Sequence, residues 1–156
     1  MSNFIGVGGL LCKEDKYLLV RHTYGEYNGQ WILPGGHVKP GEHIDNGIIR
    51  EFKEETDLDV KPLGILSIRS RIRQVDCTDC YIVFLLDYVS GCAKSDNYEN
   101  DSVQFFTIEE INHMDNIISL SKIIINTYHQ EKYSCLSASQ VHEPYLPDNK
   151  ILKLFL

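Results

Sequence analysis

At 156 residues, the chain has the length of a single globular domain. Its 43% hydrophobic and 24% charged residues exclude general disorder and a fibrous protein. The 15 basic and 22 acidic side chains give a net charge of −7, which argues against long nucleic acid as a partner. A small phosphorylated substrate remains compatible with this charge, because metal ions can bridge the two negative partners.

The N-terminus and the cysteines favour a cytoplasmic protein. Residues 1–4 lack the basic start and apolar core of a signal peptide, and no segment approaches the roughly 18 apolar residues of a membrane span. Five cysteines, an odd number at irregular spacings, suit reduced thiols better than a disulfide framework. Cys77 and Cys80 form one C-x-x-C pair, which we interpret as strand or turn residues, with metal or redox use as the alternative.

The first part of the chain predicts a β-hairpin, a loop and a short strand. Residues 4–11 and 16–22 are largely apolar and flank a polar turn, which is typical of two paired strands. Residues 24–30 are polar and contain glycine, which predicts a surface loop. Residues 31–33 then form a short apolar strand that ends at a Pro-Gly-Gly turn.

A helix is predicted over residues 44–56. Ile44, Ile48 and Phe52 recur at i, i+4 and i+8, which places them on one side of that helix. Gly47 lies inside it, where glycine costs about 1 kcal/mol relative to alanine. We expect close packing at Gly47 to explain this residue.

The second half alternates strands, a polar segment and helices. Segments rich in Ile, Val, Leu, Phe and Tyr flank a tight break near residue 76 and predict a second hairpin. The segment 91–101 has almost nothing to bury, and we expect a mobile loop there. In chain order we expect strands at 63–75 and 78–90, the loop at 91–101, a strand at 103–106, a helical turn at 108–113 and a helix at 116–132.

The C-terminal segment follows the helix as a tail with an apolar end. Serine and proline interrupt residues 134–150, and residues 151–156 are almost entirely apolar. We expect one domain at 1–133 and a tail at 134–156 that docks on the domain. Docking on a partner subunit, in a homodimer, is the alternative.

Three carboxylates gather on one surface of the predicted helix. Glu51, Glu54 and Glu55 lie at i, i+3 and i+4, so their like charges repel unless a cation lies between them. Clustered oxygen ligands suit hard ions such as Mg²⁺ or Mn²⁺. A solvated acidic face is the alternative for an arbitrary E-x-x-E-E.

The residues before this cluster decide between the two interpretations. The segment Gly36-x5-Glu42-x7-Arg50-Glu51-Phe52-x-Glu54-Glu55-x-Asp57-Leu58 resembles the Nudix box, G-x5-E-x7-R-E-U-x-E-E-x-G-U, in which U is a bulky apolar residue. It differs at Asp57, where the family has glycine at a helix end that favours a left-handed backbone. Asp tolerates that conformation at a cost of about 1 kcal/mol, so we expect the turn to survive.

The resemblance implies roles for individual residues. Glu51 and Glu55 would be the principal metal ligands, the Gly35 carbonyl a backbone ligand, and Glu54 a further ligand or the base that activates water. Arg50 would orient Glu51 for catalysis. Supporting roles would fall to Gly36, in the tight backbone before the helix, and to Glu42, beside the loop or an outer metal water. A later loop often adds a base or ligand, here Glu99, with Asp101 close by.

Residues outside the box offer weaker indications of substrate contacts. Arg69, Arg71 and Arg73 alternate along a predicted strand, so they project from one sheet face and could bind phosphate, although a solvated edge is the favoured alternative. Arg21 and His22 end the second strand beside the loop with Tyr24 and Tyr27, where phosphate contacts or base stacking would be available. Taken alone, His22 is more often structural than catalytic. Residues 74–76 carry no clear subfamily marker.

The resemblance implies an α/β fold, a Nudix-type α/β/α sandwich with a mixed β-sheet, over about residues 3–132. It also implies a Mg²⁺- or Mn²⁺-dependent hydrolase that cuts a diphosphate linkage in a nucleoside diphosphate linked to another moiety, such as a nucleotide sugar, ADP-ribose or a nucleoside triphosphate. The alternatives are a pyrophosphatase that removes oxidised nucleotides and a non-catalytic nucleotide-sensing module. A structural partner protein built around the tail is a third interpretation, which nothing in the sequence requires.

Overall fold

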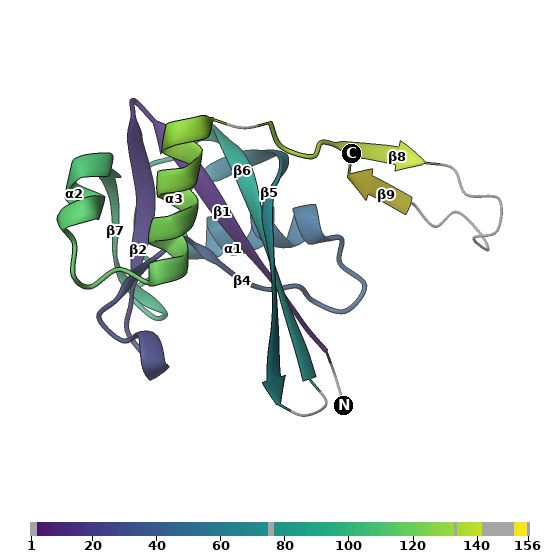
Figure 1. Cartoon of the computed structure of the whole chain (residues 1–156), viewed down its shortest axis with the longest axis horizontal. Helices are drawn as coiled ribbons and strands as arrows, with labels where there is room; N and C mark the ends of the chain where they lie inside the picture. Colours follow the sequence, from purple (N-terminus) through teal and green to yellow (C-terminus); the bar gives the residue numbers. More distant parts are fainter. Residues whose placement is uncertain (1–2, 75–76, 133, 142–151, 156) are drawn as a thin grey trace.

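A mixed β-sheet runs through the centre of the computed structural model, which describes residues 3–74, 77–132, 134–141 and 152–155 (Figure 1). Helix α1 (Ile44–Thr56) lies behind the sheet in this view, and α3 (Ser119–Glu131) lies in front, next to the short α2 (Ile108–His113). The predicted α/β/α sandwich is confirmed. The strands are β1 (Phe4–Lys13), β2 (Lys16–His22), β3 (Trp31–Ile32), β4 (Gly35–His37), β5 (Asp59–Gln74), β6 (Cys77–Ser90) and β7 (Asn100–Thr107).

Strand β1 is the centre of the sheet. It pairs in parallel with β6 from Phe4 to Leu11 and antiparallel with β4 and β2, so the sheet is mixed. The strand order is β3-β2-β1-β6-β5, and β4 and β7 pair with β1 and β2 respectively. Both predicted hairpins, β1–β2 and β5–β6, are confirmed. Cys77 and Cys80 both lie on β6. Residues three apart on a strand point to opposite faces of the sheet, so the two thiols cannot coordinate one metal ion.

Each face of the sheet buries its own hydrophobic core. On the α1 side, Ile48 and Phe52 pack with Val7 and Phe84, and all four side chains are fully buried. On the α3 side, Ile125 packs with Leu10, Val83 and other residues. Neighbouring residues of one strand, such as Val83 and Phe84, therefore enter opposite cores, as the two-residue period of a strand requires. The core on the α1 side holds this helix against β1.

Helix α1 has the bounds predicted from the sequence. It ends at Asp57, whose backbone is left-handed (φ 58°, ψ 13°) and whose N–H donates to the Lys53 carbonyl. The Lys53 ammonium contacts both the Asp57 carbonyl and its carboxylate. The predicted turn at the altered box position is confirmed, with aspartate in the place of glycine.

Several predicted boundaries are wrong: β5 begins at Asp59 instead of residue 63, and β7 begins at Asn100 instead of residue 103. Helix α3 begins at Ser119 instead of residue 116, because Asn116 and Ile118 exchange backbone hydrogen bonds with Trp31 and extend the chain beside β3. The segment 91–101 does bury a side chain, since Asn100 is fully buried at the start of β7. The loop before Asn100 is held by the Asp96 carboxylate, which accepts the backbone N–H groups of Tyr98, Glu99 and Asn100.

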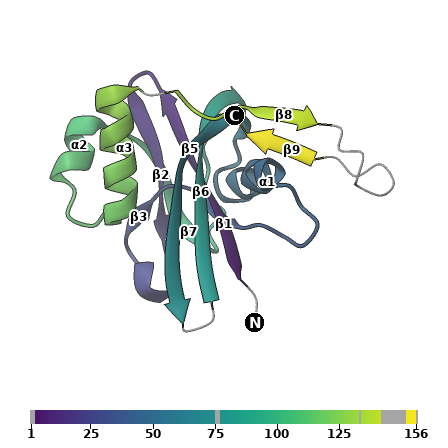
Figure 2. The same ribbon diagram turned by 45° about the vertical axis from the view of Figure 1, so that its right-hand side comes forward.

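The C-terminal segment forms a second, two-stranded sheet beside α1 (Figure 2). Strand β8 (Ala138–Val141) pairs antiparallel with β9 (Leu152–Phe155). The Phe155 ring packs edge-on against Phe84, and the Lys153 ammonium lies 2.5 Å from the Asp45 carboxylate of α1. The sequence did not place this segment, and the domain boundary at 133 stays a prediction. Among the described helices, none is long and apolar enough to cross a membrane.

Candidate active site

The side chains of Glu51 and Glu55 lie one helical turn apart on α1 and meet the backbone of β4. The Glu51 carboxylate packs on Gly36, where a Cβ would lie 2.5 Å from the nearer carboxylate oxygen. The Gly35 N–H donates to Glu55 Oε2 over 2.8 Å, and a Cβ at Gly35 would lie 2.1 Å from the Val7 carbonyl oxygen. Only glycine at both positions lets β4 pass between β1 and the two carboxylates.

Arg50 joins the carboxylates of α1 to the loop before it. Its guanidinium donates to both carboxylate oxygens of Glu42 over 2.9 Å, and to the His37 carbonyl. The Nη1 atom donates to Glu51 over 2.6 Å and to Glu54 over 3.1 Å. One arginine therefore orients three glutamates, and its hydrogen bonds to Glu42 and Glu51 raise its own pKa.

Glu42 is the most firmly bound of these carboxylates. The Arg50 guanidinium, together with the Lys39 N–H, lowers the pKa of Glu42 from 4.5 to about 2. Gly47 explains part of this packing, since a Cβ there would lie only 3.3 Å from Glu42 Oε2. The close packing expected at Gly47 is present, and its neighbour is the Glu42 carboxylate.

Glu55 is buried, and its surroundings oppose its negative charge. Only 3% of the residue is exposed, and this burial raises the pKa of Glu55 from 4.5 to about 8. The Gly35 N–H and the Asn100 side chain lower the pKa, whereas the charges of Glu51 and Glu99 raise it. The role that the resemblance implies for Glu99, as a further base or ligand, stays a prediction.

Glu54 differs from Glu55 in being exposed. Its side chain is 53% accessible and lies between the Arg50 guanidinium and the Lys39 ammonium, the latter 3.8 Å away. The Glu54 carboxylate is open to solvent, whereas the Glu55 carboxylate is buried. The two adjacent glutamates thus have different surroundings, which the helical spacing alone did not distinguish.

The donor set suits a hard divalent cation. It consists of carboxylate oxygens and a backbone carbonyl, the ligands that Mg²⁺ and Mn²⁺ prefer. Buried Glu55 supports this fit, since it faces two further carboxylates and receives only uncharged N–H donors. In the part of the chain that is described, no three acidic, histidine or cysteine side chains converge on one point, because Arg50 holds Glu51 and Glu54 while Glu55 binds Gly35.

Two of the three predicted phosphate-binding arginines share one internal partner. The Arg69 and Arg71 guanidinium groups lie 2.5 Å and 2.6 Å from the two oxygens of Asp79, which is only 2% exposed. Both side chains therefore project from one face of β5, as predicted. The side chain of Arg73 lies outside the described residues. Asp79 was missed from the sequence, because its opposite position on β6 follows from the hairpin register.

The end of β2 and the loop 23–30 form an aromatic face next to Glu99. The His22 ring lies 4.6 Å from the Tyr24 ring, and the Tyr24 hydroxyl donates to Glu99 over 3.3 Å. Arg21 turns instead to Asp101 in a two-point ion pair of 2.8 Å and 2.9 Å. Of these residues, Tyr24 is exposed, and its pKa is raised by partial burial of its hydroxyl and by the charge of Glu99, with smaller contributions from Glu55 and Glu51.

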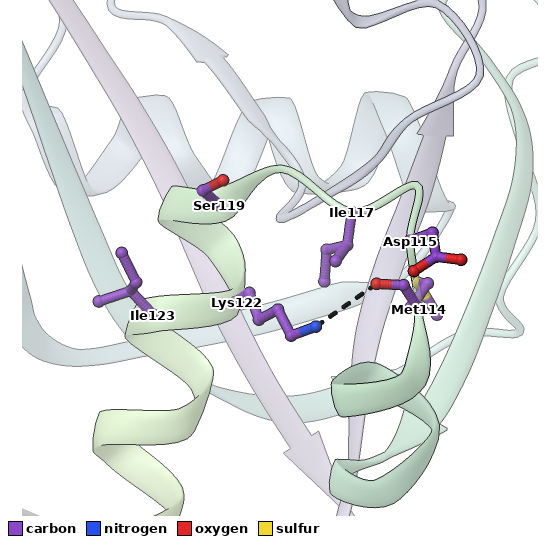
Figure 3. Close-up of a pocket in the computed structure, with 6 residues that line it drawn as sticks. All are labelled: Met114, Asp115, Ile117, Ser119, Lys122 and Ile123. Atoms are coloured by element: carbon purple, nitrogen blue, oxygen red, sulfur yellow. Dashed lines mark hydrogen bonds between the residues drawn. The ribbon is translucent and has the colours of Figure 1, made fainter.

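A surface pocket of about 360 Å³ lies elsewhere, at the α2–α3 junction (Figure 3). Lys122 points across it and donates to the Met114 carbonyl. The pocket belongs to the helical layer opposite α1 and contains none of the box carboxylates. It is therefore distinct from the candidate active site.

Comparison with known proteins agrees with this geometry. Residues 3–126 match the family described as the NUDIX domain. The chain belongs to the Nudix family. A solved NUDIX hydrolase from Nitrosomonas europaea has the same fold, with a TM-score of 0.74 and 26% identity, over 86% of this chain and 94% of that one.

Two curated Nudix relatives carry specific names. An ADP-ribose pyrophosphatase of Methanocaldococcus jannaschii is 32% identical over 108 residues, which cover 69% of this chain and 63% of that protein. The human 8-oxo-dGDP phosphatase NUDT18 is 35% identical over 68 residues, which cover 44% of this chain and 21% of that protein. The matched region thus spans less than two thirds of either Nudix relative.

Proposed function

We propose that this Nudix protein hydrolyses a diphosphate linkage in a nucleoside diphosphate joined to another moiety, with Mg²⁺ or Mn²⁺ as cofactor. The observation that carries the proposal is the packing of Glu51 and Glu55 against the glycine backbone of β4, with Arg50 behind them. Carboxylates on one side of a helix, one of them buried, suit binding to a cation and a phosphate. The intact glutamates argue against a sensing module that only binds nucleotide.

The residues divide the chemistry between them. When bound, a divalent cation supplies neutralisation of the diphosphate oxygens and a lower pKa for its water. Glu51, Glu55 and the Gly35 carbonyl would hold that cation, and Arg50 keeps Glu51 in place through their 2.6 Å contact. Exposed Glu54 serves as a further ligand or accepts the proton of the water that attacks phosphorus. The products are a nucleoside monophosphate and a second phosphorylated compound.

ADP-ribose and nucleotide sugars are the substrates that we place first. The archaeal relative named as an ADP-ribose pyrophosphatase supports this choice, since its similarity extends over most of this chain. Tyr24 and His22 offer rings beside the carboxylates on which a base or sugar would stack. Arg71, about half exposed, retains N–H donors for phosphate besides its bond to Asp79.

An oxidised nucleoside diphosphate is the second candidate substrate. The human relative named as an 8-oxo-dGDP phosphatase supports it over a shorter segment. The two candidates differ at the far end of the diphosphate, which carries a second ribose in ADP-ribose and no further group in 8-oxo-dGDP. A higher kcat/KM for 8-oxo-dGDP than for ADP-ribose would therefore favour the second.

The decisive experiment measures phosphate-containing products from nucleoside triphosphates, ADP-ribose, nucleotide sugars, dinucleoside polyphosphates and 8-oxo-dGDP, with Mg²⁺ or Mn²⁺. We expect metal-dependent turnover by the wild type and a loss of about a hundredfold or more in kcat for Glu54→Gln and Glu55→Gln. Glu131→Gln, an exposed glutamate on α3, is the matched control and should keep full activity. Absence of metal-dependent turnover of every compound by the wild type would disprove the proposal.

A further inference from the structure

Asp79 on β6 is a buried carboxylate that holds two arginines of β5. It is only 2% exposed, and its two oxygens accept the Nη2 groups of Arg69 and Arg71 over 2.5 Å and 2.6 Å. One guanidinium would be enough to neutralise this buried carboxylate. The second leaves a surplus positive charge on one face of the sheet, in a chain whose net charge is −7. This surplus suits an anionic ligand.

The two arginines lie on the α3 side of the sheet, beyond the part that this helix covers. Tyr81 packs with the core on the α3 side, and Asp79, two residues before it on β6, points to the same face. In Figures 1 and 2 the end of the β5–β6 hairpin extends past α3. Both arginine side chains are partly exposed, Arg71 more than Arg69. A guanidinium carries several N–H groups, so donors remain for a ligand besides those that bind Asp79.

A row of paired residues joins Arg69 to the strand of the box glycines. Gly6 of β1 lies opposite His37 of β4 and opposite Tyr81 of β6, and Tyr81 in turn lies opposite Arg69. The Arg69 guanidinium turns back over the Tyr81 ring, 5.3 Å from its centroid, and so lies above β6. Since neighbouring strands are about 4.8 Å apart, β6 is roughly 10 Å from β4. This span suits a diphosphate that lies across β1, with one phosphate at the box and the other towards the arginines.

We propose that Asp79 is a positioning residue that holds Arg69 and Arg71 together as the binding site for the substrate phosphate farther from the box. The inference rests on the proposed function, because it takes the ligand to be a diphosphate. Asp79 acts through the arginines, since it is buried and both of its oxygens accept their N–H groups. Without the carboxylate the two guanidinium groups would repel each other. Held in place, they can donate parallel N–H bonds to a phosphate.

The test measures binding of α,β-methylene-ADP, whose phosphate–phosphate linkage cannot be hydrolysed, to the full chain with Mn²⁺ by calorimetry. We expect Asp79→Asn and Arg71→Ala each to weaken this binding about tenfold, the loss of one charge-assisted hydrogen bond. Loss of the Asp79 charge alone would strengthen binding of an anion, so weaker binding by Asp79→Asn reports positioning. Binding of Mn²⁺ alone should be unchanged in both variants, and KM for the substrate should rise while kcat stays within about twofold.

Asp59→Asn is the matched control. Asp59 lies at the other end of the same hairpin, where it pairs with Lys53 and accepts the Ser90 hydroxyl. Its replacement should leave the affinity for α,β-methylene-ADP unchanged. Unchanged or tighter binding by folded Asp79→Asn overturns the inference, and if that variant does not fold, unchanged binding by Arg71→Ala does so. Wild type that binds α,β-methylene-ADP through Arg71 but turns over no diphosphate compound refutes the proposed function instead.

Discussion

At the scale of single residues, Glu42 shows how a charged group can support the site without belonging to the candidate ligands. Its carboxylate accepts two N–H groups from Arg50 and one from the Lys39 backbone, and its side chain is mostly buried. Arg50 in turn contacts Glu51 and Glu54. Glu42 therefore acts on the candidate ligands through the arginine, and its ionised form stabilises the loop that precedes α1.

This arrangement predicts a dependence of stability on pH. The pKa of Glu42 is about 2 in the folded protein, against an ordinary value of 4.5. The shift contributes about 3 kcal/mol to the free energy of unfolding above pH 4.5, and this contribution is lost as the pH falls towards 2. Glu42→Gln should therefore destabilise the protein by about 2–3 kcal/mol at pH 7 and by much less near pH 2.

Urea denaturation of wild type and Glu42→Gln across this pH range measures the difference. The exposed Glu131→Gln variant controls for the loss of one charge and should show no such trend. If the free energies of unfolding of wild type and Glu42→Gln differ by the same amount at pH 7 and at pH 3, Arg50 does not stabilise the ionised form of Glu42.

At the scale of elements, α1 is the part that sequence reasoning predicted most fully. Its apolar period lies within its own thirteen residues, and the box lies within residues 36–58, so local information was sufficient. The Asp57 turn was also predictable, because a left-handed residue commonly ends a helix. By contrast, the start of α3 depends on backbone bonds to Trp31, more than eighty residues earlier, and no local pattern indicates them.

The Asp57 turn permits a test of helix termination separate from catalysis. Asp57→Gly removes the strain of a Cβ at φ 58° and loses only an exposed ion pair with Lys53. It should raise the free energy of unfolding by about 0.5 kcal/mol, and Asp57→Ala should lower it by about 1 kcal/mol. Thermal unfolding of wild type, Asp57→Gly and Asp57→Ala gives the order of their stabilities. Metal-dependent activity should be the same in all three. A less stable Asp57→Gly than Asp57→Ala would contradict the role given to the backbone.

At the scale of the whole molecule, the site depends on contacts between segments far apart in the chain. Glu55 on α1 meets Gly35 on β4, His22 on β2 meets Asn100 on β7, and Arg69 on β5 meets Asp79 on β6. The sequence identified the residues of the box because a fixed spacing marks them. Asn100 and Asp79 carry no such spacing, and only the strand register brings them to their partners.

The two C-terminal strands, β8 and β9, add contacts between distant segments from outside the family region, which ends at residue 126. Leu136 exchanges two backbone hydrogen bonds with Ile65 of β5, and Lys153 reaches Asp45 near the start of α1. Phe155 adds an edge-on contact to Phe84 in the core beneath α1. Such contacts favour docking on the chain's own body, and they suggest that the hairpin helps to hold α1 against the sheet.

We predict that Phe155→Ala lowers the free energy of unfolding by about 1–2 kcal/mol, because the ring is partly buried and its loss leaves space beside Phe84. If the tail docks within its own chain, the loss of thermal stability should be the same at low and high protein concentration, since no association is involved. Leu136→Ala, an exposed side chain on the same segment, should have little effect, because Leu136 contacts Ile65 through its backbone. A loss of stability that grows on dilution, with a change of mass in sedimentation, would instead assign Phe155 to a contact between two copies of the chain.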